Sequence, residues 1–571
     1  MTSITGGELL LKCLQAEGVS VMFGVLDGSF NPFLAKLDEY GIRFVCARHE
    51  AAAAHMAEAW ARIRGEPGVC IGGIGPGAAN MVSGIVTAYA EGSPVIALSG
   101  QRRRSIIYPD RGGAFQNVEL LRLYEPVTKW RAGLRDWRRL PELMRQAYRV
   151  ATSGRPGPVY LEIPEDLMRG TGDPASAAVW PPTRYRAGRP GAGDPAAIAQ
   201  AADMLAGAER PLLHAGMGAV WADASGEFLA LADHLAAAVT TTLGARGVVP
   251  EDHPRYFHLL NQDALQAMRA EADVVLAVGA RFGELDGWGR PPMWGDPAQG
   301  RLIHVDADPT AIGLNRPVDL GILGDARATL AALLEAVKAR TGPRQEHAGF
   351  SRYRELTQKW RAQLESALRT TGAGAINPGQ VVKEIRDFFP RDAVMVMDGG
   401  CTSLWAASYH PVYAPRSYLY TAKFGHLGTG LPYAIGAKMA APDRPVYLIT
   451  GDGALGFNIQ ELETARRHDV QITIVVICDQ GWGMERPSQM MSGMGDMVET
   501  EHYAGARYDR VAEALGCHGE MVEEPAQLRP ALERAAGAGR TALIQVMVHP
   551  DANLAPPGLL VFGSMVYRAE D

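Results

Sequence analysis

The sequence predicts an α/β protein of three doubly wound domains, each built on a parallel β-sheet. Apolar strand patterns alternate with helical patterns through most of the 571 residues, as is typical of helices layered on parallel sheets. Two stretches rich in Pro, Gly and Ala, at about 169–195 and 341–349, interrupt this alternation and divide the chain into three segments of similar size. The predicted domains are 1–170, 190–340 and 375–550, followed by a tail at 551–571.

The composition is that of an ordinary globular protein, 47% hydrophobic and 21% charged, with a formal net charge of −7. That charge gives no electrostatic reason to expect nucleic-acid binding. No apolar run reaches the ~20 residues that a membrane-spanning helix needs, and the first residues lack the basic and apolar regions of a signal peptide. The six cysteines are scattered without a CxxC pair, which favours free thiols. We therefore expect a cytoplasmic protein that binds neither nucleic acid nor membranes.

The first segment contains a carboxylate at a strand end. The apolar run around Val45 ends in Arg48-His49-Glu50, and a long alanine-rich helix follows until Gly65. Glu50 therefore stands at a helix N-terminus, where an acidic side chain also stabilises the helix dipole without any catalytic role. The glycine turn 72–77 follows another strand and opens a helix, so its N–H groups could face a ligand or a partner subunit.

The middle segment has three strands that each run into a tight turn, near Gly216, Gly279 and Asp306. These strand ends should share one sheet edge, the place where α/β sheets bind nucleotides, and Asp306 could accept a ribose hydroxyl. Ordinary βα turns of a structural domain would give the same pattern, because Gly-x-Gly alone is nonspecific. FAD, ADP or no nucleotide therefore remain open for this segment.

The third segment places small residues at successive strand ends. Met395–Met397 leads into Asp398-Gly399-Gly400, and the glycine-rich stretch 425–432 follows with His426 inside it. Clustered glycines of this kind allow a diphosphate to approach the backbone. His426 is either a catalytic group or a hydrogen-bonded structural histidine.

The most informative motif of the third segment is Gly451-Asp452-Gly453, which follows the apolar run 446–450. Asp479 ends the next apolar run, 27 residues after Asp452, and Gly481 comes shortly after it. Two carboxylates and a tight glycine turn at one sheet edge predict a site for a hard divalent cation that carries a diphosphate. The alternative is a pair of N-cap aspartates on two βα loops.

These motifs together resemble one family over almost the whole chain. The chain is similar to the thiamine-diphosphate-dependent enzymes of the acetolactate synthase, pyruvate decarboxylase and benzaldehyde lyase group. The motifs that carry the resemblance are Ile4-Thr5-Gly6-Gly7-Glu8-Leu9, Arg48-His49-Glu50, Gly75-Pro76-Gly77 with Asn80, Ala114-Phe115-Gln116, Pro126-Val127-Thr128-Lys129, 425–432 and the Gly-Asp-Gly turn. The resemblance implies a pyrimidine-binding domain, a central domain and a diphosphate-binding domain, in that order.

The resemblance also implies residue roles. Asp452, Asp479 and the carbonyl of Gly481 would hold Mg²⁺, which binds the cofactor diphosphate. Leu427 would lie under the cofactor, and Glu50 would hydrogen-bond the aminopyrimidine nitrogen N1′ and so promote loss of the thiazolium C2 proton. Further cofactor-binding positions would be Gly399, Gly400, His426, Gly453, Ala454, Trp482 and Met484. In this family two subunits complete one site, so the resemblance implies a homodimer or a homotetramer.

Several positions depart from the usual family pattern. Cys478-Asp479 replaces Asn-Asn, which keeps an oxygen ligand and adds negative charge. Asp27 stands where proline and glycine are usual and could enter the active site. Gln116 matches the synthase and lyase branch, whereas Glu485 occupies the position of a proton-relay glutamate in decarboxylases. Either a catalytic role or a solvated helix start fits Glu485.

The resemblance implies an enzyme that makes or breaks a C–C bond next to a carbonyl. Acetolactate-synthase-like carboligation of 2-oxo acids is the first prediction. The alternatives are a lyase of the benzaldehyde lyase or 2-hydroxyacyl-CoA lyase type, acting on a 2-hydroxy ketone or releasing an aldehyde, and a 2-oxo acid decarboxylase. A relative that binds the cofactor without turnover is a further alternative. Trp482, Met484, Gln116 and the tail beyond Asp551 would shape the acceptor pocket.

Overall fold

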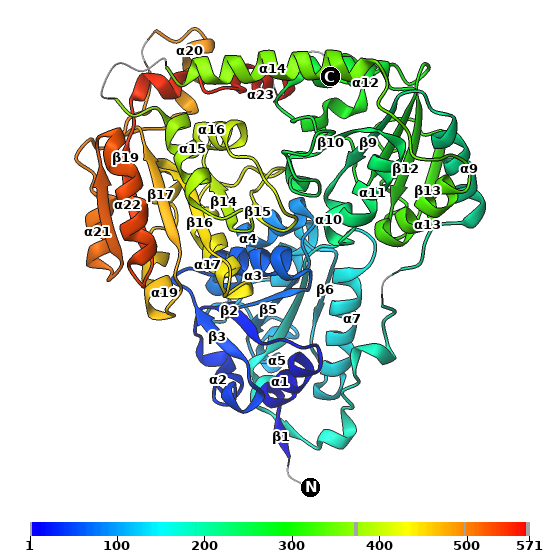
Figure 1. Ribbon diagram of the computed structural model, residues 1–571. Helices are drawn as coiled ribbons and strands as arrows, with labels where there is room; N and C mark the ends of the chain where they lie inside the picture. The colour runs from blue at the N-terminus through cyan, green and yellow to red at the C-terminus, as the bar shows by residue number, and fades with distance from the viewer. Residues whose placement is uncertain (1–2, 189, 370–374, 496, 567–571) are drawn as a thin grey trace.

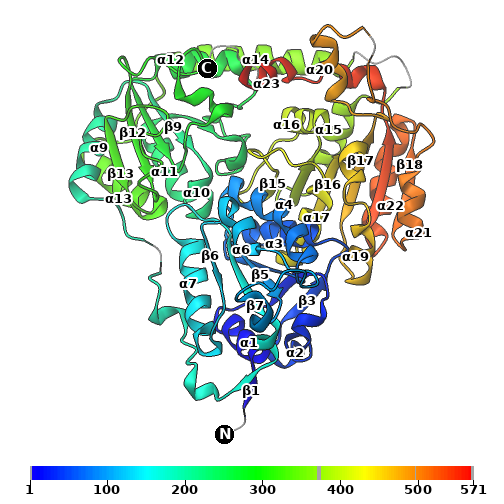
Figure 2. The ribbon, with the colours of Figure 1, turned by 180° about the vertical axis from the view of Figure 1, so that it is seen from behind.

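The protein consists of three α/β domains around three parallel sheets, as the sequence predicts (Figure 1). The structure is a computed structural model that describes residues 3–188, 190–369, 375–495 and 497–566. The N-terminal domain lies at the bottom of Figure 1, with the central domain at upper right and the C-terminal domain at upper left. Figure 2 shows the same arrangement from behind. Among the described residues, no helix combines the length and apolar character needed to cross a membrane.

The N-terminal sheet has six parallel strands in the order β3-β2-β4-β5-β7-β6. Its strands are β2 (Val21–Gly24), β3 (Arg43–Cys46), β4 (Gly68–Gly72), β5 (Val95–Gln101), β6 (Trp130–Gly133) and β7 (Val159–Pro164). A short antiparallel ribbon of β1 (Ile4–Thr5) and β8 (Thr171–Gly172) joins the start of this domain to the first predicted linker. The inner strands β4, β5 and β7 are buried along their whole length, as a parallel sheet covered by helices requires, whereas the strands β3 and β6 at the two edges are partly exposed.

The central sheet has five parallel strands in the order β10-β9-β11-β12-β13. Its strands are β9 (Pro211–Ala215), β10 (Ala238–Thr241), β11 (Val274–Val278), β12 (Arg301–Asp306) and β13 (Leu320–Leu323). The three strand ends singled out in the sequence therefore do meet at one sheet edge, since β9, β11 and β12 are neighbours. The long helix α14 (Gly349–Ala367) then runs across the top of the molecule towards the C-terminal domain (Figure 1).

The C-terminal sheet again has six parallel strands, in the order β15-β14-β16-β17-β19-β18. Its strands are β14 (Val394–Asp398), β15 (Tyr418–Leu419), β16 (Val446–Gly451), β17 (Thr473–Cys478), β18 (His518–Val522) and β19 (Ala542–Met547). In chain order this is the same topology as the N-terminal sheet. The predicted diphosphate motifs all lie at the carboxyl ends of its strands.

The N-terminal and C-terminal domains pack through helices rich in small residues. Helix α3 (Glu50–Arg64) lies between α4 (Pro76–Glu91) and α17 (Gly430–Ala440), and its alanines are buried. A side chain at Gly436 of α17 would collide with the backbone of Met56. Small side chains at these points let the helix backbones approach closely, so the two domains share one apolar core.

Candidate active site

The two predicted metal carboxylates lie at neighbouring strand ends of the C-terminal sheet. Asp452 begins α18 (Asp452–Gly456) directly after β16, and Asp479 follows β17. Both are 2% exposed. Burial, and next the negative charge of Asp479, raise the pKa of Asp452 to about 6. Because two buried carboxylates repel each other, this pair is a donor set that a divalent cation would stabilise.

A cavity of about 300 Å³ adjoins these carboxylates and extends between the C-terminal and central domains. Its lining includes eleven of the residues that the sequence predicted: Gly399, Gly400, Leu427, Asp452, Gly453, Ala454, Asp479, Gly481, Trp482, Met484 and Glu485. Glycines among these residues let the backbone of the C-terminal domain lie close to neighbouring side chains. A Cβ at Gly400 would lie 2.7 Å from the Cβ of Met484, and one at Gly453 would lie 3.0 Å from the Trp482 ring.

The central domain and the C-terminal segment close the other side of the cavity. This wall combines apolar side chains, among them Leu260, Leu285, Met293, Val561 and Phe562, with polar ones that include Arg269 and Asp286. Apolar walls exclude water and strengthen electrostatic interactions inside a site. Of the residues predicted to shape the acceptor pocket, Trp482, Met484 and the C-terminal segment line this cavity. Gln116 does not line it.

A second cluster of predicted residues surrounds the glycine turn after β4. A Cβ at Gly73 would lie 2.5 Å from Oδ2 of Asp27, and one at Gly77 would lie 3.1 Å from Oε1 of Glu50. A Cβ at Gly75 would collide with the backbone of Gln116. The turn 72–77 is therefore glycine-rich because three other segments of the N-terminal domain pack against it.

Within this second cluster, Glu50 is the first residue of α3 and is half-buried. Its Oε2 accepts a hydrogen bond of 3.1 Å from Nδ2 of Asn80. Asp27 is the N-cap of the short 3₁₀ turn Gly28–Phe30, and its side chain accepts a bond of 2.8 Å from the backbone N–H of Ser29. Gln116 is exposed and has a φ of 58°, a left-handed conformation that is uncommon outside glycine.

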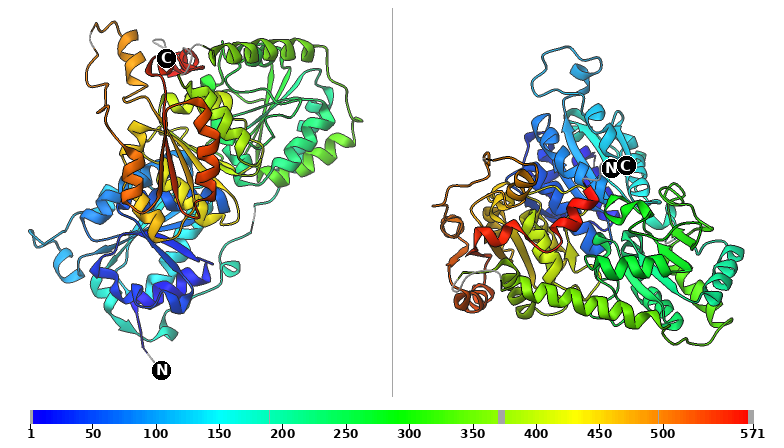
Figure 3. Two further views of the ribbon diagram at one scale, coloured as in Figure 1. Left: turned by 60° about the vertical axis from the view of Figure 1, so that its left-hand side comes forward. Right: turned by 90° about the horizontal axis from the view of Figure 1, so that it is seen from above.

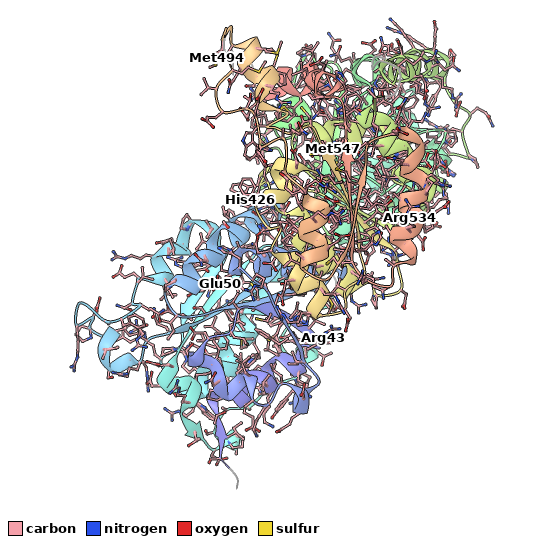
Figure 4. All side chains as sticks on the ribbon, turned by 90° about the vertical axis from the view of Figure 1, so that its left-hand side faces the viewer. Arg43, Glu50, His426, Met494, Arg534 and Met547 are labelled. Carbon is pink, nitrogen blue, oxygen red and sulfur yellow. The ribbon has the colours of Figure 1, made fainter. Side chains whose placement is uncertain are left out.

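The two clusters do not meet within the described part of one chain. Glu50, Asp27, Gln116 and His426 are not among the residues that line the cavity. Figure 4 shows Glu50 on the N-terminal domain, below His426 of the C-terminal domain. One chain therefore presents a diphosphate-type half-site and, separately, a half-site that carries Glu50.

His426 lies at the boundary between the domains. Its ring centroid is 4.9 Å from that of His55 in α3 and 6.2 Å from that of Phe424. Burial lowers its pKa, so the neutral ring is favoured. The role of His426 in cofactor binding stays a prediction.

Sequence reasoning missed several residues that contact the carboxylates, and two of them are His502 and Asn553. His502 Nδ1 lies 3.3 Å from Oδ2 of Asp452, and Nδ2 of Asn553 donates a 2.8 Å hydrogen bond to Oδ2 of Asp479. They come from a loop and from the C-terminal segment, respectively. Neither stands at a strand end or in a glycine-rich motif, so no local pattern marks them.

Comparisons with known proteins agree with this geometry. Family models match residues 4–122, 198–333 and 398–546 as the N-terminal TPP binding domain, the central domain and the C-terminal TPP binding domain of thiamine pyrophosphate enzymes. A probable acetolactate synthase large subunit of Methanocaldococcus jannaschii is 33% identical, over 97% of this chain and 94% of that protein. The acetolactate synthase isozyme 2 large subunit of Escherichia coli is 32% identical, over 97% of this chain and 98% of that protein.

The chain therefore belongs to the thiamine pyrophosphate enzyme family. Within that family it is an enzyme of the acetolactate synthase type, and its two outer domains are the thiamine-diphosphate-binding ones. The resemblance found in the sequence is thus confirmed, as is the fold of three parallel-sheet domains.

Proposed function

We propose that this chain uses thiamine diphosphate and Mg²⁺ to join two 2-oxo acids, as the name acetolactate synthase implies for its relatives. The observation that carries the proposal is the pair of buried carboxylates, Asp452 and Asp479, beside a cavity walled by glycine turns. The raised pKa of Asp452 supports a cation there, because the cation would relieve the repulsion between the carboxylates. Asp452, Asp479 and the Gly481 carbonyl would hold Mg²⁺ and, through it, the diphosphate.

When bound, thiamine diphosphate supplies an electron sink for the bond broken next to a carbonyl. The chain's own residues bind it, orient it and move one proton. Glu50 would hold a proton against the aminopyrimidine nitrogen N1′, and its place as the first residue of α3 would help to orient its carboxyl. Leu427 would support the cofactor from below, and the apolar wall near Phe562 would exclude water.

The separation of the two half-sites supports a shared active site. Glu50 lies outside the cavity of its own chain, so a second copy would supply it. We propose a homodimer or a homotetramer in which each site combines the C-terminal domain of one subunit with the N-terminal domain of its partner. This arrangement also gives the exposed side chains of Phe115 and Leu26 a surface to pack against.

Glu485 favours a second candidate function. It lines the cavity, and its carboxylate remains exposed at the start of α20 (Glu485–Met491). A proton donor there would release an aldehyde instead of allowing carboligation, which is the outcome of a 2-oxo acid decarboxylase. Lyases of the benzaldehyde lyase or 2-hydroxyacyl-CoA lyase type share the same cavity chemistry.

A nucleotide in the central domain, FAD or ADP, is a separate proposal. Asp306 at the sheet edge supports it, and burial raises the pKa of this carboxyl. Gly216 and Gly218 support the structural alternative, because their N–H groups donate to Val278 and Gly279 in the neighbouring turn. The colour of the purified protein and chromatography of the nucleotide released on denaturation distinguish flavin, ADP and neither.

A product screen tests the proposed function. The purified protein, with thiamine diphosphate and Mg²⁺, is incubated with pyruvate, benzoylformate, benzoin or a 2-hydroxyacyl-CoA. Acetolactate from pyruvate supports carboligation, an aldehyde alone supports a decarboxylase, and cleavage of benzoin or of the thioester supports a lyase. Binding of the cofactor without turnover of any of these compounds would instead support the alternative of a relative that binds the cofactor without catalysis.

The scattered free cysteines and the composition support a cytoplasmic location, which fractionation of cells would check.

A further inference from the structure

The C-terminal segment crosses the cavity. After β19 the chain forms a 3₁₀ turn (Pro550–Leu554) and then α23 (Leu559–Val566), which packs against the 3₁₀ segment Glu284–Gly289 of the central domain. Figure 3 shows α23, in red, passing between the C-terminal and central domains. Val561 and Phe562 line the cavity. Residues 567–571 lie outside the described part of the chain.

One side chain of this segment reaches the metal carboxylates. Asn553 is 3% exposed, and both ends of its amide are bonded. Its Oδ1 accepts a 2.8 Å hydrogen bond from the Trp405 indole, and its Nδ2 donates a 2.8 Å bond to Oδ2 of Asp479. Because an indole N–H only donates and a carboxylate only accepts, these two partners fix the orientation of the amide.

A glycine provides the space for this bond. A Cβ at Gly483 would lie 2.7 Å from Nδ2 of Asn553 and 2.8 Å from Oδ2 of Asp479. Any larger residue would therefore wedge apart the two bonded groups. The absence of a side chain at Gly483 thus leaves room for the bond between Asn553 and Asp479, and a substitution there would disturb it.

The bond also orients the carboxylate of Asp479. Nη1 of Arg486 lies 3.6 Å from the same oxygen, Oδ2, so both donors approach one side of the carboxylate. The other oxygen, Oδ1, is then available as a ligand. Hydrogen bonds from outside a coordination sphere commonly fix ligand carboxylates in this way.

We infer that Asn553 is a positioning residue for the metal site and ties the C-terminal segment to it. The inference rests on the proposed function, in which Asp479 is a Mg²⁺ ligand. The docked segment holds Asp479 in its ligand geometry, and by linkage bound Mg²⁺ and diphosphate hold the segment over the cavity. Docking of the C-terminal segment over the cavity and binding of the metal therefore stabilise each other.

The test compares Asn553→Ala with two other variants of the full chain. Gly483→Ala perturbs the same bond from the opposite side with Asn553 intact, and so serves if Asn553→Ala folds poorly. Asn377→Ala is the matched control, because Asn377 is also fully buried in the C-terminal domain but caps α15 (Pro378–Phe388) away from the cavity. Tryptophan fluorescence measures Mg²⁺ affinity at a fixed concentration of thiamine diphosphate, and hydrogen exchange follows residues 548–566.

We expect Asn553→Ala and Gly483→Ala to weaken Mg²⁺ binding about 10- to 100-fold. In the unmodified protein, Mg²⁺ with thiamine diphosphate should slow exchange in residues 548–566, and Asn553→Ala should abolish that protection. Asn377→Ala should lower the melting temperature and leave unchanged both the Mg²⁺ affinity and the exchange of residues 550–566. His549 is left out of this comparison, because its N–H donates to the carbonyl of Ile376 beside Asn377.

Unchanged Mg²⁺ affinity in both test variants would overturn this inference alone, provided that the unmodified protein binds Mg²⁺ and thiamine diphosphate. An equal loss in Asn377→Ala would also overturn it, since the effect would then be a general loss of stability. If the unmodified protein bound neither probe, the proposed function would fail, and this inference with it.

Discussion

The N-terminal and C-terminal sheets have the same strand order, yet their carboxyl edges differ. In the C-terminal domain the strand ends carry glycines and two buried aspartates around an open cavity. In the N-terminal domain the corresponding turn 72–77 is packed against Asp27, Gln116 and Glu50. One topology thus carries two buried aspartates beside a cavity in one copy, and a tightly packed glycine turn next to the carboxylates of Asp27 and Glu50 in the other. Fold does not decide function here; the residues at the strand ends do.

Replacing Glu50 at the N-terminal edge should have the largest effect. Glu50→Gln keeps a side chain of the same shape but cannot exchange a proton, so kcat should fall by ~10²–10⁴-fold. Affinity for thiamine diphosphate, measured by fluorescence titration, should stay near that of the unmodified protein. Glu142→Gln is the control, because Glu142 is also an acid in the first turn of a helix in this domain. Equal kcat values for the two variants would mean that Glu50 only stabilises the dipole of its helix and has no catalytic role.

Substitutions at the C-terminal edge should weaken cofactor binding rather than proton transfer. Asp479→Ala removes a proposed Mg²⁺ ligand, so the Kd for thiamine diphosphate at fixed Mg²⁺ should rise by ~100-fold or more. This effect should exceed the effect of losing a hydrogen bond to the ligand, as in Asn553→Ala. Asp443→Ala, an exposed aspartate just before β16, should leave that Kd unchanged. A Kd that did not depend on Mg²⁺ in the unmodified protein would remove Asp479 from the ligand set.

The sequence predicted the parts of this comparison that are local. A glycine turn after an apolar run marks a strand end, and neighbouring parallel strands bring such ends together, so Asp452, Asp479 and Gly399 were found from their immediate context. Glu50 was found only as a helix start, and its role came from the family resemblance. Asn553 could not be found, because its partner Asp479 lies 74 residues away and only the fold brings them together. The domain boundaries drawn from the linkers stay predictions.

Mixing the two defective variants tests whether the edges cooperate across subunits. If each site uses Glu50 of one subunit and Asp479 of its partner, a dimer of one Glu50→Gln chain and one Asp479→Ala chain has one intact site. Random reassembly of equal amounts should then restore about a quarter of the unmodified activity. The assay is acetolactate formation after co-expression, with each variant alone as the baseline. No recovery in demonstrated heterodimers would place both edges of a site within one chain.

The smallest expected effect concerns Glu461, the first residue of α19 (Glu461–Arg467), which links the C-terminal domain to the segment just before Glu50. Its Oε1 and Oε2 lie 3.1 and 3.2 Å from the backbone N–H of Arg48, two residues before Glu50. Burial raises the pKa of Glu461 from 4.5 to about 7, so the folded state favours its protonated form. The folded state then binds more protons than the unfolded state between these values, and stability should fall as pH rises from about 4.5 to 7.

Glu461→Gln should flatten this trend, because the glutamine stays neutral and still offers an oxygen to the N–H of Arg48. The expected difference across the pH range is at most about 2–3 kcal/mol. Thermal unfolding of both proteins at pH 5 and pH 8 measures it. The neighbouring Glu463 is the control with the opposite sign, since hydrogen bonds from Arg467 lower the pKa of its carboxyl. Its contribution is present above pH 4.5, so Glu463→Gln should cost stability at pH 8. If Glu461→Gln left the pH trend intact, the contact between the N-terminal and C-terminal domains at Arg48 would not depend on the charge of this carboxyl.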